Sequence, residues 1–190
     1  ELYTSIEKEG KTVIPNGRFL TPAGQNYLVA PHPYGLAVSN DGNIAVTANS
    51  GTNPISITII RNILSENPEI QQVPPSSEGD KGILESVFMG LAISPDNQSV
   101  YVAGGQANKV YIFDIGTGAG KGAIDCSSND DRGDFSHGYI GDMTISHDGK
   151  LLYAVDQIGF RVIVIDLKKQ KVVSFIPVGR YPFGIAIGKA

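Results

Sequence analysis

Short runs of alternating small, polar and apolar residues dominate the chain, and turn signals separate them. Runs rich in apolar and β-branched residues lie at 55–60, 110–114, 162–166 and 171–176. Turn signals lie at 40–42, 95–97 and 147–149. The Asp-Gly and Asp-Asn pairs in these turns tolerate the positive φ that tight hairpins need. Almost no helical periodicity is visible, so the pattern predicts many short antiparallel strands.

One unit of this kind recurs without gaps. It reads GLAVSNDGNIAVTAN over 35–49, GLAISPDNQSVYVAG over 90–104 and DMTISHDGKLLYAVD over 142–156, and a fourth start lies at 183–188. Each unit is a hairpin followed by a third strand, and the last unit adds a fourth. Four antiparallel strands connected in sequence form one blade of a β-propeller. Glycine and alanine near the start of each unit, such as Gly90 and Ala92, indicate an inner strand close to the propeller axis.

The spacing between the units predicts two insertions. The equivalent residues Ser39, Ser94 and Ser146 are 55 and 52 positions apart, whereas a bare blade takes about 40–45 residues. The extra residues lie in 62–87, where three prolines are expected to prevent a regular strand, and in 116–139, which is rich in Gly, Ser and Asp. We expect both insertions to be loops rather than separate domains.

The sequence therefore predicts an all-β fold, a partial β-propeller with about three blades of a seven-bladed ring. The expected division is an N-terminal segment with a candidate clasp strand at 1–30, blades with insertions at 31–87 and 88–139, a blade at 140–180, and the first strand of a further blade at 181–190. Such an open fan exposes apolar faces at both ends. We expect the remaining blades of the same protein, or a second copy of the chain, to cover them.

The repeats resemble the YVTN family of β-propellers, found in archaeal surface-layer proteins and in similar bacterial proteins. The resemblance covers 30–190 and rests on second strands such as Tyr101-Val102-Ala103-Gly104, and most specifically on IPVGRYPFGIA at 176–186. Asp156 departs from the usual Asn of the repeat. The segment IPNGRFLTPAG at 14–24 is similar to the start of proteins that join such a propeller to a C-terminal phosphoesterase domain of the alkaline-phosphatase type. The resemblance implies a periplasmic, cell-surface or secreted bacterial protein whose metal ligands and nucleophile lie in that C-terminal domain, so no catalytic residue is assigned here.

Charge and composition narrow the functions further. The formal net charge of -4 argues against a nucleic-acid partner. No run approaches the roughly 18 apolar residues of a membrane span. The one cysteine, Cys126, forms no disulfide within the chain and is expected to be a small loop residue rather than a nucleophile. Because the chain begins at Glu1, without an initiating Met or a signal peptide, we interpret it as a processed or truncated product.

No metal or cofactor site is predicted. The three histidines, which lack zinc-site spacing, are His32, His137 and His147. The run 125–134 is rich in oxygen ligands but lacks the EF-hand order, so a solvated loop is favoured over a calcium site. The run 116–122 has the glycines of a phosphate loop but not its spacing, and no helix follows it. The inner strands offer only Asp142 as an acid.

The candidate site lies where the loops that enter each inner strand meet the loops between second and third strands. Aromatic and polar groups are mixed there, as in recognition surfaces. The candidate ligand-binding residues are His32, Tyr34, Asn49, Asn53, Gln106, Asn108, Asp156, Arg180 and Tyr181. The alternative interpretation is that the tyrosines and their neighbouring prolines seal the junctions between blades.

These observations predict a non-catalytic propeller module that binds a protein or glycan, or serves as a scaffold. Two alternatives stay open. One is a propeller hydrolase of the lactonase or phytase type, which holds a metal in the central channel, where Asp142 alone gives too few ligands. The other is a purely structural surface-layer repeat. We expect the chain by itself to have no phosphoesterase activity, because no part of it concentrates the carboxylates and histidines of a two-metal site.

Overall fold

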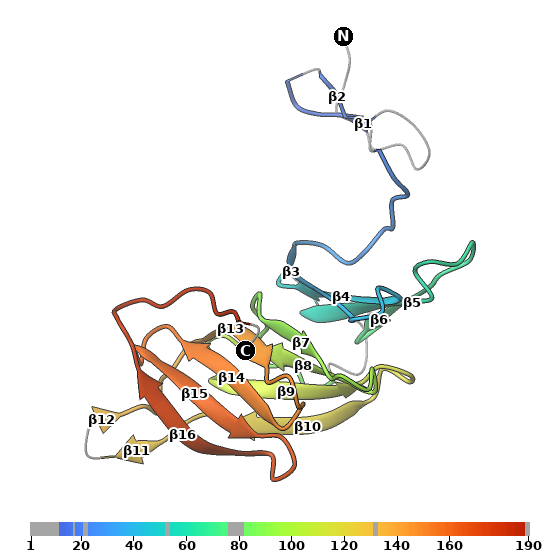
Figure 1. Ribbon diagram of the computed structural model, residues 1–190. Helices are drawn as coiled ribbons and strands as arrows, with labels where there is room; N and C mark the ends of the chain where they lie inside the picture. Colours follow the sequence, from blue (N-terminus) through green and yellow to red (C-terminus); the bar gives the residue numbers. More distant parts are fainter. Residues whose placement is uncertain are drawn as a thin grey trace.

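Three four-stranded antiparallel sheets follow one another along the chain in the computed structural model (Figure 1). The structure describes residues 12–16, 18–20, 23–51, 54–75, 82–130 and 133–188, and these contain strands and turns but no α-helix. In each sheet the strands are paired in sequence order. The sheets are therefore three blades of a partial β-propeller, and the predicted fold class is confirmed.

The strands have the following bounds. The first blade consists of β3 (Pro33–Val38), β4 (Ile44–Asn49), β5 (Ser56–Arg61) and β6 (Glu69–Val73). The second consists of β7 (Leu91–Ile93), β8 (Ser99–Ala103), β9 (Lys109–Asp114) and β10 (Gly120–Asp125). The third consists of β13 (Ile140–Ile145), β14 (Leu151–Asp156), β15 (Arg161–Asp166) and β16 (Lys171–Pro177). Two short hairpins stand outside these sheets, β1 (Thr12–Val13) with β2 (Phe19–Leu20) and β11 (Asn129–Asp130) with β12 (Gly133–Asp134).

The interpretation of the two insertions as loops was wrong in one respect, because each contains the outer strand of its blade. Strand β6 lies within 62–87 and pairs with β5, and β10 lies within 116–139 and pairs with β9. Pro68 directly precedes β6 and Pro74 directly follows it. A proline next to an outer strand removes no ladder hydrogen bond, so these prolines delimit the strand instead of preventing it.

Residues 23–32, directly before the first blade, and residues 178–188, after the third, carry no strand. The Ala30 N–H donates to Thr58 Oγ1 at 3.4 Å, and the Ile185 N–H donates to Asp142 Oδ2 at 3.0 Å. Each segment therefore contacts the blade next to it. That 26–30 is a clasp strand and that 183–188 opens a further blade stay predictions.

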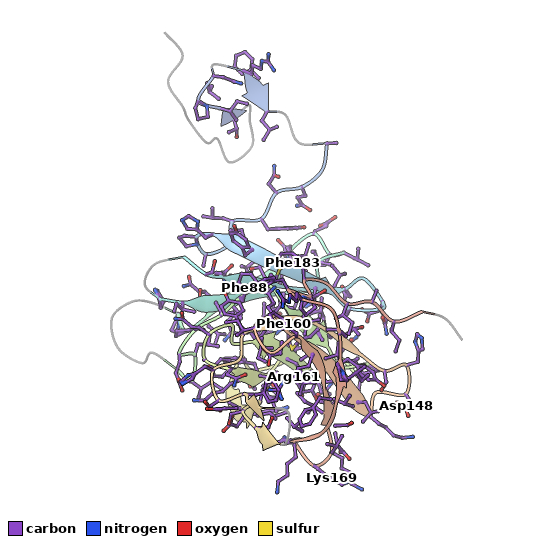
Figure 2. The ribbon with its side chains drawn as sticks, turned by 90° about the vertical axis from the view of Figure 1, so that its left-hand side faces the viewer. Phe88, Asp148, Phe160, Arg161, Lys169 and Phe183 are labelled. Carbon is purple, nitrogen blue, oxygen red and sulfur yellow. The ribbon has the colours of Figure 1, made fainter. Side chains whose placement is uncertain are left out.

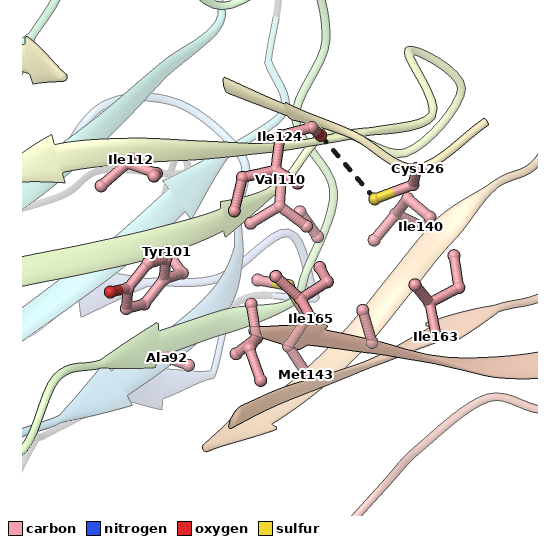
Figure 3. Packing of buried hydrophobic residues seen from close by; sticks show 13 residues of the cluster. Ala92, Tyr101, Val110, Ile112, Ile124, Cys126, Ile140, Met143, Ile163 and Ile165 are labelled. Atoms are coloured by element: carbon pink, nitrogen blue, oxygen red, sulfur yellow. Dashed lines mark hydrogen bonds between the residues drawn. The ribbon is translucent and has the colours of Figure 1, made fainter. Parts of the chain in front are cut away.

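Two apolar cores lie between the blades. The core between the first and second blades includes Val46, Ala48, Ile57, Ile59, Val100, Val102, Tyr111 and Phe113. The core between the second and third blades, shown in Figure 3, includes Val110, Ile112, Ile124, Ile140, Leu152, Ile163 and Ile165. Each core takes alternate residues from the strands that face it, as the period-two pattern of the sequence requires. Hydrophobic burial between blades is therefore what holds the fan together.

Apolar side chains remain exposed at both ends of the fan. Leu36 and Val38 on β3 are 67% and 54% exposed, and Ile176 on β16 is 49% exposed. Apolar surface of this extent is usually covered in soluble proteins. Further blades or a partner would therefore complete this partial propeller.

Glycines let the inner strands approach each other closely. Strand β7 lies between β3 and β13. A Cβ added at Gly35 would lie 1.9 Å from the Met89 carbonyl oxygen, and one at Gly90 would lie 2.0 Å from the Gly141 carbonyl oxygen. Backbone therefore packs directly on backbone where the blades meet, as the repeated glycines predict.

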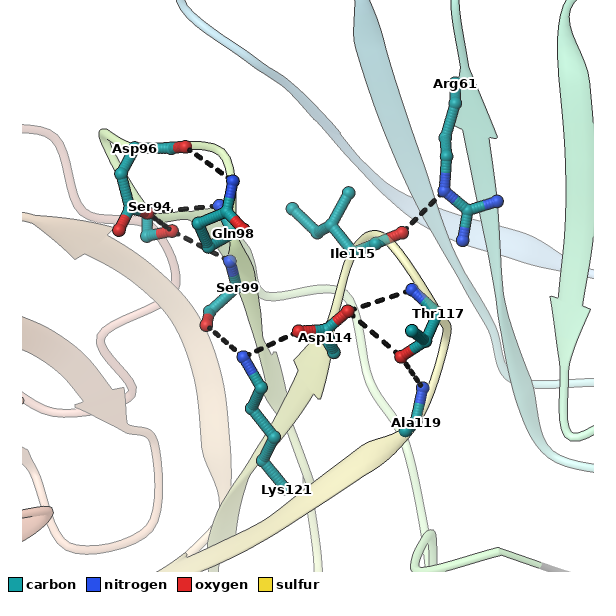
Figure 4. A network of polar contacts seen from close by, with 10 residues as sticks. All are labelled: Arg61, Ser94, Asp96, Gln98, Ser99, Asp114, Ile115, Thr117, Ala119 and Lys121. Carbon is teal, nitrogen blue, oxygen red and sulfur yellow. Dashed lines mark hydrogen bonds and ion pairs between the residues drawn. The ribbon is translucent and has the colours of Figure 1, made fainter.

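The hairpin between the first two strands of every blade is closed by a serine and an aspartate. The serine hydroxyl donates to aspartate Oδ1 at 2.5–2.7 Å, and this oxygen also accepts the N–H two residues further on. The serine Oγ in turn accepts the N–H of the residue that begins the second strand. The pairs are Ser39 with Asp41, Ser94 with Asp96, and Ser146 with Asp148; Figure 4 shows the second. The repeated Ser-x-Asp sequence thus fixes the geometry of each turn.

These hydrogen bonds lower the pKa of the three turn carboxyls, that of Asp148 to about 2. Lys121 and Thr117 lower the pKa of Asp114 to about 2 in the same way (Figure 4). A folded pKa below the unfolded value means that the folded state favours the ionised form. The stabilisation from these carboxylates is therefore fully present above about pH 4 and is lost as the pH falls through the folded values.

We expect Ser146→Ala to raise the pKa of Asp148 toward its ordinary value, because the serine hydroxyl is the main group that lowers it. Carboxyl ¹³C NMR titration of both proteins measures this pKa directly. The pKa of Asp96 in the second blade is the internal control and should not move. An unchanged Asp148 midpoint in the variant would show that the serine does not hold the carboxylate.

Candidate functional site on the loop face

The loop face is the end of the fan where the chain enters each inner strand and passes from the second strand to the third. Its described segments are 31–34, 50–51, 86–90, 104–108, 138–139, 157–160 and 178–183. Figure 2 views the molecule from the side on which these loops of the third blade lie. Eight of the predicted ligand-binding residues lie on or beneath this face, and Asn53 lies outside the described residues.

A buried ion pair lies under the loop face of the third blade. Arg161 Nε donates to Asp156 Oδ2 at 2.9 Å, and the side chains are 2% and 0% exposed. The other carboxylate oxygen, Asp156 Oδ1, accepts the N–H of Tyr139 at 3.0 Å and that of Gly159 at 2.9 Å. Buried charge is tolerated only when it is paired and hydrogen-bonded, as it is here.

The same arginine joins the third blade to the insertion of the second. Its Nη1 donates to Ser128 Oγ at 2.7 Å, and its Nη2 donates to the Cys126 carbonyl at 3.2 Å. The guanidinium carbon lies 3.9 Å from the centre of the Phe135 ring and 5.0 Å from that of Phe175. Ion pair, hydrogen bonds and cation–π contacts together fix the insertion against the blade.

Asn108 supports the loop face from below in the second blade. Its Nδ2 donates to the carbonyls of Phe135 and Ser136 at 3.0 and 3.3 Å, and the residue is 4% exposed. A Cβ added at Gly138 would lie 2.4 Å from Asn108 Oδ1 and 2.9 Å from Asp156 Oδ2. Because Gly138 has no side chain, Asn108 and Asp156 can lie close together beneath the surface.

Asn49 belongs to a polar network within the first blade. It is 1% exposed, and its Nδ2 donates to Ser56 Oγ at 3.3 Å and to Thr58 Oγ1 at 2.9 Å. Its Oδ1 accepts the hydroxyl of Thr47 at 2.8 Å. Every polar atom of this amide has a partner inside the sheet, so Asn49 joins β4 to β5 rather than facing solvent.

Aromatic rings form an arc along the loop face, one from each blade. Tyr34 lies on β3, Phe88 precedes β7 and Tyr139 precedes β13. The Tyr34 and Phe88 ring centres are 6.3 Å apart and nearly parallel, and those of Phe88 and Tyr139 are 5.1 Å apart in an edge contact. Because Tyr34 is 66% exposed, the arc presents aromatic surface to solvent as well as packing between blades.

Tyr181 and Phe160 make a second aromatic pair beside the third blade. Their ring centres are 5.2 Å apart in an edge contact, and Tyr181 is 74% exposed. Tyr181 has φ 51, and His32, three residues before the glycine of the first unit, has φ 55. Since Tyr181 also stands three residues before a glycine, Gly184, the two loops share both sequence pattern and backbone conformation.

The predicted residues therefore divide into exposed and buried groups. His32, Tyr34, Gln106, Arg180 and Tyr181 are exposed on the loop face. Asn49, Asn108 and Asp156 are buried and support the loops from below, and that any of the eight residues binds a ligand stays a prediction. Arg161 was not among the predicted residues. It lies two positions before Ile163 and four before Ile165, so the period-two pattern of a strand places it on the same buried face of β15.

Cys126 and Asp142 are the other residues that the sequence offers for chemistry. Burial raises the pKa of the Cys126 thiol to about 12, so it stays protonated at neutral pH. Asp142 Oδ1 accepts the N–H of Met143 and its Oδ2 accepts that of Ile185. Within the described ranges, no three His, Cys, Asp or Glu side chains gather in a way that would hold a metal ion. Nor do these ranges contain a helix with the length and apolar character of a membrane span.

Comparison with known proteins identifies the fold. No protein family matches the sequence, and no curated protein is similar to it. Among solved structures, the chain is similar to hydrazine synthase of Kuenenia stuttgartiensis, with a TM-score of 0.59 and 19% identity over 85% of this chain and 40% of that one. A functionally unknown protein from Desulfotomaculum acetoxidans has a TM-score of 0.57 and 21% identity over 93% of this chain and 52% of its own.

The WD40 repeats of RRP9 match with a TM-score of 0.51 and 15% identity over 76% of this chain and 38% of that one. At these identities the similarity supports the fold alone, and that fold is a β-propeller. The chain spans between 38% and 52% of the length of these structures.

Proposed function

We propose that this chain is part of a non-catalytic propeller that binds a protein or glycan through its loop face, in a secreted or cell-surface bacterial protein. We further propose that the same protein carries a phosphoesterase domain of the alkaline-phosphatase type. The observation that carries the binding role is the aromatic arc of Tyr34, Phe88 and Tyr139, which runs across all three blades.

The geometry beneath the arc supports this role. Loops on a binding surface need to be held in place, since ordering them on binding costs affinity. Here Asp156 and Arg161 fix the loops of the third blade and the insertion of the second from below. Exposed tyrosines such as Tyr34 and Tyr181 offer a large contact area with a hydrogen-bonding end, which recognition surfaces favour.

The link to a phosphoesterase rests on the resemblance of 14–24 to the start of proteins of that architecture. The shared backbone conformation of His32 and Tyr181 supports the reading of 181–187 as the entry to another blade. The propeller-hydrolase alternative needs free oxygen ligands along the channel. No Asp or Glu side chain is among the described residues that line the groove beside the inner strands, and Asp142 holds backbone N–H groups. This lining favours the binding role.

A test uses the intact protein from which this chain comes, with two measurements on each sample. The first is hydrolysis of p-nitrophenyl phosphate with added zinc, manganese or calcium. The second is co-sedimentation with cell-envelope fragments from the source organism. We expect metal-dependent hydrolysis that Asp142→Asn preserves, because asparagine keeps an acceptor for the Ile185 N–H. We expect the double substitution Tyr34→Ala with Tyr181→Ala to reduce co-sedimentation at least about tenfold, because both rings leave the loop face.

Leu64→Ala is the matched control, since Leu64 is 76% exposed at the opposite end of the first blade, after β5. It should leave co-sedimentation unchanged. Loss of hydrolysis in Asp142→Asn would favour the hydrolase with a metal in the channel. Equal co-sedimentation of the double variant and the parent would rule out the loop face as the binding surface.

A further inference from the structure

The segment 183–188, which we call the strap, lies beside the inner strand of the third blade without joining its sheet. Figure 1 shows it ending next to β13. The Ile185 N–H donates to Asp142 Oδ2 at 3.0 Å, and His147 Nε2 lies 2.9 Å from the Gly188 carbonyl oxygen, which accepts its proton. Asp142 is on β13 and His147 is in the turn that follows. We call these two residues the latch, because they hold the strap at both ends.

Both latch residues are departures from the repeat. Asp142 stands at the position of Gly35 and Gly90, and His147 stands at a turn position that is asparagine in the first unit and proline in the second. At the two glycines, the inner strands pack backbone on backbone, within 2.0 Å of where a Cβ would lie. Asp142 has a Cβ, so this approach is closed to it. Its carboxylate makes the contact with the strap instead.

The strap buries little apolar surface. Phe183 is 61% exposed and Ile187 is 38% exposed, whereas Leu152 and Ile163 of the same blade are fully buried. Segments with few buried apolar contacts open at a much lower free energy than core strands. The strap can therefore leave the blade while the four-stranded sheet stays folded.

The connection between β16 and the strap has its own attachment to the blade. The Val178 N–H donates to the Phe160 carbonyl at 2.9 Å, and the Tyr181 ring makes its edge contact with the Phe160 ring. These contacts do not involve the latch. Opening of the strap therefore pivots about 178–182, and the loop face keeps its shape.

The strap also forms part of the wall of the groove beside the inner strands. This groove has a volume of about 400 Å³ and is lined by the inner strands of all three blades, by His147 and, from the strap, by Ile187. No residue of the loop-face segments is among the described residues that line it. Departure of the strap therefore widens the groove along β13.

We propose that the strap is releasable, that Asp142 and His147 latch it onto the third blade, and that its release opens the groove along β13. The loss of either hydrogen bond raises the population of the open form, because the closed form alone makes both bonds. This device is separate from the binding role of the loop face, since the groove and that face share no described residue.

The amide hydrogen of Ile185 reports the state of the latch. In the second unit, the Gly90 carbonyl accepts the Ala103 N–H. Alternation along an antiparallel strand then turns the N–H of Leu91, the equivalent of Ile185, away from the ladder. The Ile185 N–H therefore keeps Asp142 as its acceptor whether or not a further strand pairs with the strap.

Hydrogen exchange of the intact protein, followed residue by residue with mass spectrometry, tests the proposal. We expect Asp142→Ala to raise the exchange rate of the Ile185 amide at least about tenfold, the size expected for loss of a hydrogen bond to a charged acceptor. Asp142→Asn should give a smaller rise, because the amide oxygen remains an acceptor. Asp166→Ala is the matched control, since Asp166 accepts the Lys169 N–H in a turn of the same blade, and it should leave Ile185 unchanged.

The second half of the latch has its own set of variants. His147→Ala should raise the exchange rate of the Ile185 amide roughly threefold or more, through loss of one hydrogen bond. His147→Gln should restore most of the protection, because the glutamine amide can donate to the Gly188 carbonyl. His137→Ala removes another exposed imidazole, in the insertion of the second blade, and should have no effect.

Oxidation of Met143 by dilute hydrogen peroxide measures the opening of the groove. Met143 lines the groove and is 4% exposed. We expect His147→Ala to speed its conversion to the sulfoxide, measured by peptide mass, and His147→Gln to stay close to the parent. An unchanged oxidation rate in His147→Ala would show that the strap does not control access to the groove.

Equal exchange of the Ile185 amide in Asp142→Ala and the parent would overturn the latch. Exchange of this amide at the unprotected rate in the parent would overturn it as well, because the strap would then not be closed. The amide of Ile163, in the central strand β15, separates local from global opening. If Asp142→Ala accelerates Ile163 and Ile185 equally, the unit that opens is the whole blade, and the strap is not a separate device.

Discussion

Asp156→Ala is expected to lower the free energy of unfolding by about 3–5 kcal/mol, because it leaves the Arg161 guanidinium buried without its counter-ion. It also removes the acceptor for the N–H groups of Tyr139 and Gly159. Urea unfolding, followed by the fluorescence of the eight tyrosines in this tryptophan-free chain, measures the change. A loss this large is a substantial part of the stability of an ordinary domain.

The double substitution Asp156→Ala with Arg161→Met is the control for this prediction. Methionine keeps much of the arginine volume without its charge, so the double variant should be more stable than Asp156→Ala alone. Ser127→Ala, an exposed position beside the network, should change stability by less than about 0.5 kcal/mol. Equal stability of Asp156→Ala and the parent would mean that the ion pair does not fix the insertion on the third blade.

The blades could be predicted from the repeat because interactions between residues close in the sequence form each hairpin. Alternation within β4, β8 and β14, and the Asp-Gly or Asp-Asn turns before them, determine each hairpin within fifteen residues. The outer strands β6 and β10 lack this signal. Gln71 and Gln72 in β6 and the glycines of β10 have low strand preference, so pairing with β5 and β9 determines their conformation.

The position of the loop face could be predicted from the sequence, but the roles of its residues could not. The repeat positions Asn49 and Asp156 correctly at strand ends, yet their burial depends on neighbours far away in the sequence. Asp156 is covered because Ser128 and Phe135 of the preceding blade meet its arginine partner. The strap likewise reaches the two latch residues from 43 and 41 positions away in the sequence.

The departure of Asp142 from the repeat shows how the sequence could have led to the latch. Alignment of the units places Asp142 opposite Gly35 and Gly90. Glycine at such a position is the ordinary choice where two backbones approach closely. An aspartate that replaces it is a departure from local preference, and such departures concentrate at functional positions.

Gly90→Val is expected to lower the free energy of unfolding by about 3 kcal/mol, the upper end of the range for overpacking. A Cβ at Gly90 would lie 2.0 Å from the Gly141 carbonyl oxygen and 3.1 Å from the Asp142 Cα. Both contacts are with the backbone of the next inner strand, which has no rotamer to change. Relief therefore requires β7 and β13 to move apart, and this motion opens the core between the second and third blades.

Gly179→Val is the matched control, because a Cβ at Gly179 meets nothing within 4 Å. The two variants carry the same substitution, so they share its effect on the unfolded chain, and their difference reports the contact between the inner strands. The measurement is the urea midpoint of each variant and of the parent at the same denaturant slope. Equal midpoints for Gly90→Val and Gly179→Val would contradict direct backbone packing between the blades, since the contact with Gly141 is the feature that distinguishes the two positions.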